Sequence, residues 1–181
     1  MYHNNNGYKN SNWYNAGYYG INPQSQTRQN SMIMDYGQQP FVVNINNITK
    51  QNRTFRTAVW TGDHLQLTLM SIAVGEDIGL EMHPDVDQFL RIEQGQGIVY
   101  MGQNKNNLNF ARYVSDDTAI IIPAGTWHNV VNTGNIPLKL YSIYAPPNHP
   151  FGTVHQTKGD AMASEENHVN WQNYYNMQTY W

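Results

Sequence analysis

Four side chains that can bind a metal ion, Glu81, His83, Gln88 and His128, lie in two short segments of the sequence. Glu81 and His83 are two residues apart, so on a strand both side chains project from the same face. One carboxylate and two imidazoles form a ligand set that suits Fe(II), Mn(II) or a related ion, and the amide oxygen of Gln88 is a candidate fourth ligand. The sequence therefore predicts one divalent transition metal per chain, with Mn, Fe, Zn and Ni all open.

Each of these residues also has an interpretation without a metal. A single histidine in a strand is commonly a core residue whose nitrogens are hydrogen-bonded. Glu81 can serve as a general base or a structural acid, and Gln88 can orient a neighbour. A register shift would make Asp85 or Asp87 the carboxylate ligand, although it would break the spacing of the segment. The sequence leaves these alternatives open.

Two turns position the four side chains. Residues 84–87, Pro-Asp-Val-Asp, read as a turn that leads into a return strand at 88–92. Residues 123–126 read as a second turn, followed by a strand at 127–131 that carries His128. Two hairpins whose inner faces each carry a histidine can converge inside a small barrel.

The rest of the central region also reads as short strands between Gly, Pro and Asn turns. Leu65, Leu67 and Leu69 alternate with other side chains at a period of two, which is typical of a strand. Further strands are expected at 41–45, 55–60, 97–101, 108–113 and 138–144. This pattern predicts an all-β sandwich or barrel. The one helix that we expect covers 158–168.

The spacing of the chemistry-bearing residues resembles the two paired motifs of the cupin superfamily, G-x5-H-x-H-x3-4-E-x6-G and G-x5-P-x-G-x2-H-x3-N. Glu81 occupies the position of the first histidine of this pattern, and Gln88 occupies the position of its glutamate. One histidine is therefore lost and the carboxylate is moved to a different position, so the formal charge of the site is kept. The matching positions are Gly75, His83 and Gly95 in the first motif and Pro123, Gly125, His128 and Asn132 in the second, where Asp117 replaces the first glycine. The resemblance implies a double-stranded β-helix, or jelly-roll barrel, with a metal site inside it.

The stretches HPDVDQFLRIEQGQG, IIIPAGTWHNVVNTG, PLKLYSIYAPP and HPFGTVHQTK are similar to small bacterial cupins of the mannose-6-phosphate isomerase-like group. This similarity implies a metal-dependent sugar or sugar-phosphate isomerase with a small sugar-like ligand. His149 and His155 are the candidates that would move a proton. Arg91 and Lys139 are isolated basic side chains, so no phosphate-binding cluster is evident. The superfamily hosts many chemistries and some non-enzymes, so the fold does not fix the function.

Composition excludes several classes of function. The net charge is -3 and only 13% of the 181 residues are charged, so no basic surface indicates a nucleic acid or an anionic membrane as partner. No apolar run is long enough to span a membrane, and because the first ten residues contain no apolar stretch we expect no secretory signal peptide. Cysteine is absent, which excludes disulfides and thiolate chemistry. We expect a protein that is cytoplasmic as synthesised.

The sequence divides into four parts: an N-terminal arm at 1–39, a barrel at 40–157, the helix at 158–168 and a tail at 169–181. The arm holds eight Asn and six of the 13 Tyr residues, and the tail again sets aromatic residues among Asn and Gln. Such segments have too little aliphatic surface to fold alone, and they tend toward self-association. Their composition is similar to that of spore-coat proteins. A structural protein of a spore surface layer is therefore the alternative to an enzyme.

We expect the chain to be its own partner. Small cupins commonly pair through the apolar outer face of a sheet, so the resemblance implies a homodimer. The segments 41–43 and 138–141 are apolar on more than one face, which is typical of strands that are buried on both sides. The aromatic residues of the arm and tail are expected to extend this dimer into a larger assembly.

Overall fold

The computed structural model of the chain describes residues 33–164. The chain divides into two units, Met1–Ser31 and Met32–Trp181, and the described residues all belong to the second. The predictions for 1–32 and for the tail at 169–181 fall outside the described residues.

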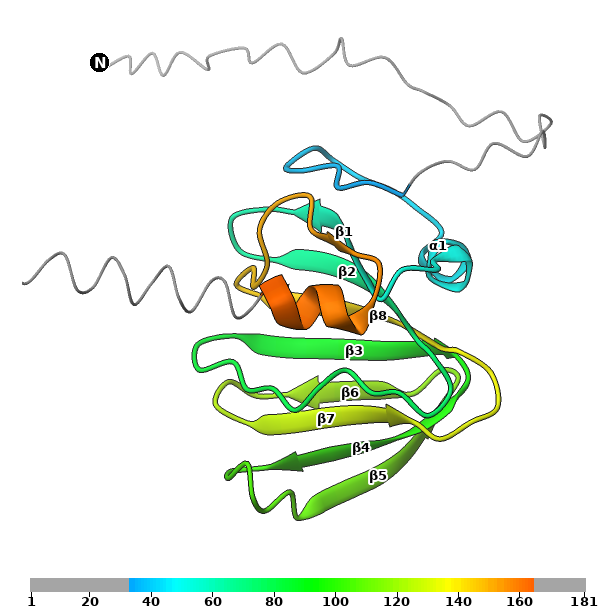
Figure 1. The fold of residues 1–181 in the computed structure, drawn as a ribbon. Coiled ribbons are helices and arrows are strands. Elements are labelled where there is room, and N and C mark those ends of the chain that lie inside the picture. Colours follow the sequence, from blue (N-terminus) through cyan, green and yellow to red (C-terminus); the bar gives the residue numbers. More distant parts are fainter. Residues whose placement is uncertain (1–32, 165–181) are drawn as a thin grey trace, which may run out of the picture. The chain divides into compact units, whose positions relative to one another are not determined.

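Two antiparallel β-sheets make up this unit (Figure 1). The larger sheet has six strands in the order β6-β3-β8-β2-β1-β9, and the smaller sheet has three in the order β5-β4-β7. The strands are β1 Arg56–Thr61, β2 Gln66–Ile72, β3 Asp87–Gln94, β4 Gln96–Gly102, β5 Phe110–Ser115, β6 Ala119–Ile122, β7 Trp127–Asn132, β8 Leu138–Ala145 and β9 Val154–His155. This is the jelly-roll fold that the sequence predicted.

The space between the sheets has an apolar part and a polar part. Alternate residues of each strand face inward. The apolar core includes Met70, Ile92 and Leu140 of the larger sheet and Val99 and Val130 of the smaller one. On the same inner face, further along the strands, lie polar side chains that are fully or almost fully buried: Arg56, Gln66, Thr68, Gln88, His128 and Ser142. Buried polar groups are rare unless they have a partner, so this part of the interior is where a functional site is expected.

The prediction of a strand at 41–45 was wrong, because a short helix, α1 (Ile45–Gln51), begins there. The side chain of Asn44 accepts a hydrogen bond from the backbone N–H of Asn47, which caps the helix N-terminus. Helix α1 then packs on β8, β3 and β2. The predicted C-terminal helix is confirmed from residue 158 to the last described residue, 164.

The turns of the two motifs require an unusual backbone conformation. Gly125 has a φ of 76°, in the left-handed region that favours glycine. Asp117, which replaces the first glycine of the second motif, has a φ of 67° and is the non-glycine residue with a positive φ among those described. Aspartate tolerates this region better than most side chains. The substitution therefore preserves the turn.

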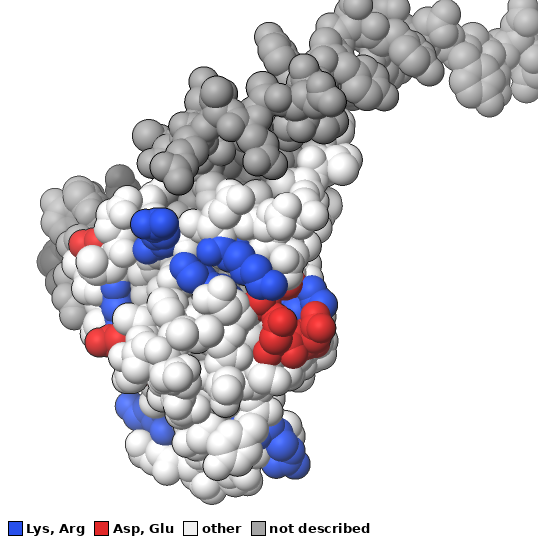
Figure 2. Space-filling model, turned by 90° about the vertical axis from the view of Figure 1, so that its right-hand side faces the viewer, with Lys and Arg blue, Asp and Glu red and all other residues white. Residues whose placement is uncertain are grey.

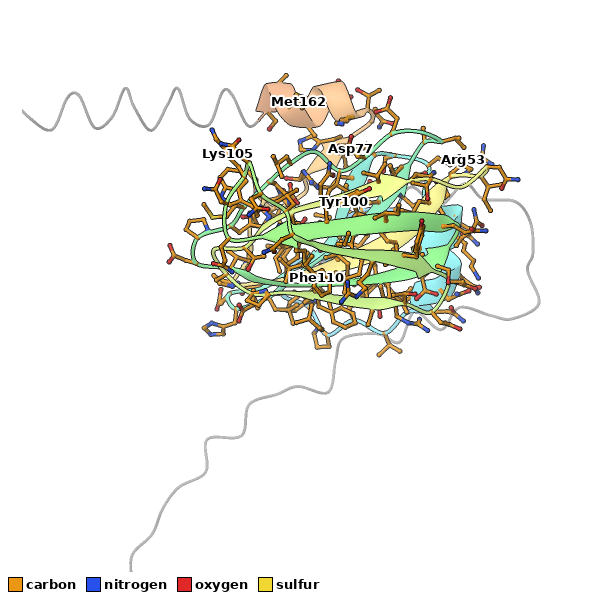
Figure 3. All side chains as sticks on the ribbon, turned by 90° about the horizontal axis from the view of Figure 1, so that it is seen from below. Arg53, Asp77, Tyr100, Lys105, Phe110 and Met162 are labelled. Atoms are coloured by element: carbon orange, nitrogen blue, oxygen red, sulfur yellow. The ribbon has the colours of Figure 1, made fainter. Side chains whose placement is uncertain are left out.

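The segment before α1 and the helix after β9 are both fastened to the sheets. Asp35 accepts hydrogen bonds from Gly37, Thr61 and Gly152. At the other end, Lys158 donates to Asp77 at 2.8 Å, and Figure 3 shows Met162 of the same helix at the edge of the barrel. Residues 33–41 and 158–164 are thus integral parts of the folded unit.

Candidate metal centre

The side chains of Glu81, His83 and His128 meet at one place in the polar part of the interior. One ligand atom from each of them lies within 4.8 Å of the other two. Oε1 of Glu81 lies 3.3 Å from Nε2 of His128 and 3.5 Å from Nε2 of His83. The structure thus brings together three of the four residues that the sequence singled out as metal ligands.

Backbone hydrogen bonds join the two motif segments at this point. Glu81 and His128 form an antiparallel bridge in which each N–H donates to the other carbonyl, at 3.0 and 2.9 Å. A second bond joins the same two segments: the N–H of Gly125 donates to the carbonyl of His83 at 2.8 Å. The sequence had indicated a strand for Glu81 and His83. In the structure they lie in this bridged segment, outside the regular strands.

The hydrogen bond of His128 to the backbone fixes which of its ring nitrogens is available. Nδ1 of His128 lies 2.9 Å from the carbonyl oxygen of Thr126. A carbonyl only accepts, so Nδ1 carries the proton and the neutral ring has its lone pair on Nε2. That lone pair is directed at the carboxylate oxygen of Glu81, 3.3 Å away. Two acceptors at this distance repel each other unless a cation or a proton lies between them, so the arrangement fits a bound metal ion.

His83 supports the same conclusion. Its Nε2 is buried and makes no hydrogen bond within residues 33–164. Its ring lies 5.6 Å from the ring of His128, measured between centroids. A buried imidazole nitrogen without a hydrogen bond is accounted for when it binds a metal.

Glu81 is held in its charged form. Burial by itself would raise the pKa of Glu81, but its close contacts with His128 and His83 and the nearby positive charge of Arg56 together hold that pKa well below its usual value. Nη2 of Arg56 lies 3.7 Å from Oε2 of Glu81. The carboxylate is therefore ionised at neutral pH, as a metal ligand must be.

Comparison with known proteins identifies the family to which the chain belongs. Residues 68–144 match the family described as the cupin domain. An uncharacterised protein of Bacillus subtilis (strain 168), YrkC, is 72% identical over 138 residues, which are 76% of this chain and 74% of that protein. The chain belongs to the cupin superfamily.

Two further relatives extend the comparison for this cupin. An uncharacterised protein of Acanthamoeba polyphaga mimivirus is 44% identical over 117 residues, 64% of this chain and 71% of that protein. The crystal structure of BH2720 from Bacillus halodurans superposes with a TM-score of 0.72 at 69% identity and covers 72% of this chain and 99% of that one.

The remaining candidate ligands of this cupin have different surroundings. Gln88 lies on the inner face of β3, where Nε2 donates to Oγ of Ser142 at 3.0 Å and Oε1 is buried without a hydrogen bond within the described residues. Asp87 instead accepts from the backbone N–H of Ala124 at 2.9 Å, and Asp85 is exposed. The carboxylate of the described cluster is Glu81, and neither aspartate belongs to it.

Both candidate proton carriers lie beside the centre. The ring of His149 packs edge-on against Tyr144 at 5.0 Å between centroids, and the ring of Tyr144 lies 5.7 Å from that of His83. Burial and the positive charge of Arg56 lower the pKa of His149 to about 3. His155 is the strand partner of Arg56, and burial and Arg56 lower its pKa too. Both imidazoles are therefore neutral at physiological pH.

Sequence reasoning missed Arg56 and Tyr144. Arg56 is 1% exposed and Tyr144 is fully buried, and both face the centre from the larger sheet. An arginine inside the apolar run 55–60 was the available signal, because a charged residue in a buried strand needs an internal partner.

Other surface features lie away from the centre. A groove of about 670 Å³ beside the helix at 158–164 is lined by Arg53, Phe55 and Met162 among others, and it contains none of the candidate ligands. On the face shown in Figure 2, charged side chains form a few small groups on a mostly uncharged surface, and the main acidic group lies directly beside basic side chains. None of the helices in the described part of the chain is long and apolar enough to cross a membrane.

Proposed function

We propose that this cupin binds one divalent transition metal through Glu81, His83 and His128 and uses it in a reaction of a small oxygenated molecule. The observation that carries the proposal is the convergence of a largely buried, ionised carboxylate and two imidazole nitrogens within 4.8 Å. An open coordination position on such an ion is what a catalytic site requires. The identity of the metal stays a prediction among Mn, Fe, Zn and Ni.

An isomerase-like reaction of a sugar or sugar phosphate is the reaction class that we propose. A metal ion at this site would act as a Lewis acid on the carbonyl oxygen of the substrate. His149, neutral at physiological pH, has a lone pair to accept the proton from the carbon beside that carbonyl. Its imidazole is a weak base when the site is empty, and it gains basicity as negative charge develops on the substrate next to it. The same imidazole then returns the proton to the former carbonyl carbon, while the proton of the neighbouring hydroxyl group moves to the former carbonyl oxygen, so that the carbonyl group shifts by one carbon.

Hydrogen–deuterium exchange tests the proton-abstraction step of this reaction, and it does so even for a compound that is not converted to the isomeric product. The metal-loaded protein is incubated in D2O with a panel of aldoses, ketoses and their phosphate esters, and proton NMR follows the signal of the carbon next to the carbonyl. We expect metal-dependent loss of that signal for at least one compound, and loss of the effect in His149→Asn. Protein that holds its metal and exchanges no compound of the panel would contradict the isomerase-like activity.

Self-assembly is a second candidate function, and one feature of the barrel favours it. Five apolar side chains lie in register across the outer face of the larger sheet: Ile121, Phe89, Ile143, Leu67 and Trp60. Ile121 is 62% exposed, although isoleucine is usually buried. An apolar row of this kind is typical of a surface that another protein molecule covers. Incorporation of such an assembly into a spore surface layer is a prediction from the composition of the arm and tail alone.

A further inference from the structure

The inner face of the larger sheet holds polar side chains that the three metal ligands do not use. Thr68 on β2 and Ser142 on β8 are strand partners, and both are fully buried. Gln88 on the neighbouring strand β3 is 2% exposed. All three lie on the face that carries the core residues Met70, Leu140 and Leu90, so they project into the barrel.

Two polar atoms of this group have no partner. Oγ1 of Thr68 and Oε1 of Gln88 are buried and make no hydrogen bond within residues 33–164. Because Nε2 of Gln88 donates to Oγ of Ser142, the hydroxyl hydrogen of Ser142 stays able to donate to another acceptor. Because buried polar atoms in folded proteins nearly always have partners, a molecule inside the barrel is expected to supply them.

These side chains are next to the candidate metal centre. Tyr144 is the strand partner of Gln88, and its ring lies 5.7 Å from the ring of His83. Tyr144 therefore borders both the candidate metal centre and the polar group on β2, β3 and β8.

We propose that Thr68, Gln88 and Ser142 form a subsite that binds a hydroxyl group of the substrate. A hydroxyl both donates and accepts, so it can donate to Oε1 of Gln88 and pair with the hydroxyl of Thr68 or Ser142. A carboxylate or phosphate would place acceptor oxygens against Oε1 of Gln88, which only accepts. The proposal rests on the proposed function and deepens it, since it names the substrate class: a small molecule with a hydroxyl beside its metal-binding oxygen. It assigns Oε1 of Gln88 to the substrate and not to the metal.

Binding of two matched ketones tests the subsite. In hydroxyacetone a hydroxyl takes the place of one methyl group of 2-butanone, and ligand-observed NMR measures the affinity of each for metal-loaded and for metal-free protein. One well-placed hydrogen-bonding hydroxyl predicts that wild-type protein binds hydroxyacetone about tenfold more tightly. In Thr68→Val, which keeps the shape of the side chain, we expect the preference to fall to about twofold or less. Ser71→Ala, on the same strand but on the opposite face, is the control and should keep it.

The two proposals fail in different ways in this experiment. A metal content near zero would contradict the proposed function, while the preference for hydroxyacetone in metal-free protein still reports on the subsite. Equal affinity for the two ketones in wild-type protein, or an unchanged preference in Thr68→Val, would overturn the subsite. Gln88→Met should keep the metal and lose the preference, so loss of the metal in this variant would overturn the assignment of Gln88 to the substrate.

Discussion

At the scale of single residues, the centre combines an ionised carboxylate with imidazoles that stay neutral. Glu81 owes its charge to His128, His83 and Arg56, which outweigh the effect of its burial on its pKa. His149 is neutral because burial and the same Arg56 oppose its protonation. One buried guanidinium thus favours the charged form of the acid and the neutral form of the base, which are the forms that a metal ligand and a proton acceptor need.

The depressed pKa of His149 predicts how stability depends on pH. Its pKa is about 3 in the folded protein against an ordinary value of 6.5, so between these values the unfolded chain binds a proton that the folded chain does not. Stability should be unaffected by this group above pH 6.5 and should fall as the pH drops from 6.5 toward 3. Melting curves of chelator-treated protein between pH 4.5 and 6.5 should show a smaller loss in His149→Asn than in wild type.

The matched control for this experiment is His64→Asn, because His64 is exposed in the turn between β1 and β2. The slope that remains in His149→Asn should come from His155, whose pKa is also lowered by burial and by Arg56, and near pH 4.5 from Glu81, whose carboxyl group takes up a proton in the unfolded chain first. Parallel curves for wild type and His149→Asn would contradict the account of the buried imidazole.

At the scale of elements, the turns of the motifs limit which residues are tolerated. Gly95, between β3 and β4, has a φ of 93°, and a Cβ there would lie 3.0 Å from the carbonyl oxygen of Pro137. Gly95→Ala should therefore lower the free energy of unfolding by about 1–3 kcal/mol, as measured by denaturant titration. Gly159→Ala, in the helix at 158–164, meets only an ordinary contact at 3.6 Å and should cause no loss. Equal free energies of unfolding for the two variants would show that a side chain at position 95 does not strain the turn.

The elements also show how much of the fold could be predicted from the sequence. Strands β1 to β5, β7 and β8 follow from the alternation of apolar and polar residues and from the Gly and Pro turns, because local pattern determines which face is buried. Helix α1 was missed because 41–45 has the β-branched composition of a strand, whereas its N-terminus depends on the side chain of Asn44. Glu81, His83 and His128 were found from spacing within two segments. Arg56, Thr68 and Tyr144 were not, because only strand register brings them to the centre from distant parts of the chain.

At the scale of the whole molecule, the apolar row on the outer sheet face predicts a homodimer. The row is continuous with a groove of about 450 Å³ lined by Leu67, Ile143, Trp60 and Phe41 among others. Phe89→Glu places a charge within the row, between Ile121 and Ile143, and should convert the dimer to a monomer in sedimentation velocity experiments. Tyr113→Glu, on the exposed strand β5 of the other sheet, should leave the dimer intact. A stable wild-type monomer at micromolar concentration would rule out this interface.

Assembly beyond the dimer is predicted to depend on the aromatic arm. Because Asp35 and its neighbours are fastened to the barrel, the deletion that tests this should remove residues 1–31 only. Light scattering should show smaller particles after the deletion, while the melting temperature of the barrel stays unchanged. Particles of unchanged size would show that the arm is not needed for assembly.

Metal analysis of protein purified without chelator decides whether a metal ion lies between Glu81, His83 and His128. We expect about one divalent transition metal per wild-type chain and almost none in the double variant His83→Ala, His128→Ala. A second double variant, His64→Ala with His155→Ala, removes two histidines outside the cluster and should retain the metal. Wild-type metal content in the His83→Ala, His128→Ala protein, with its fold confirmed by circular dichroism, would contradict the account.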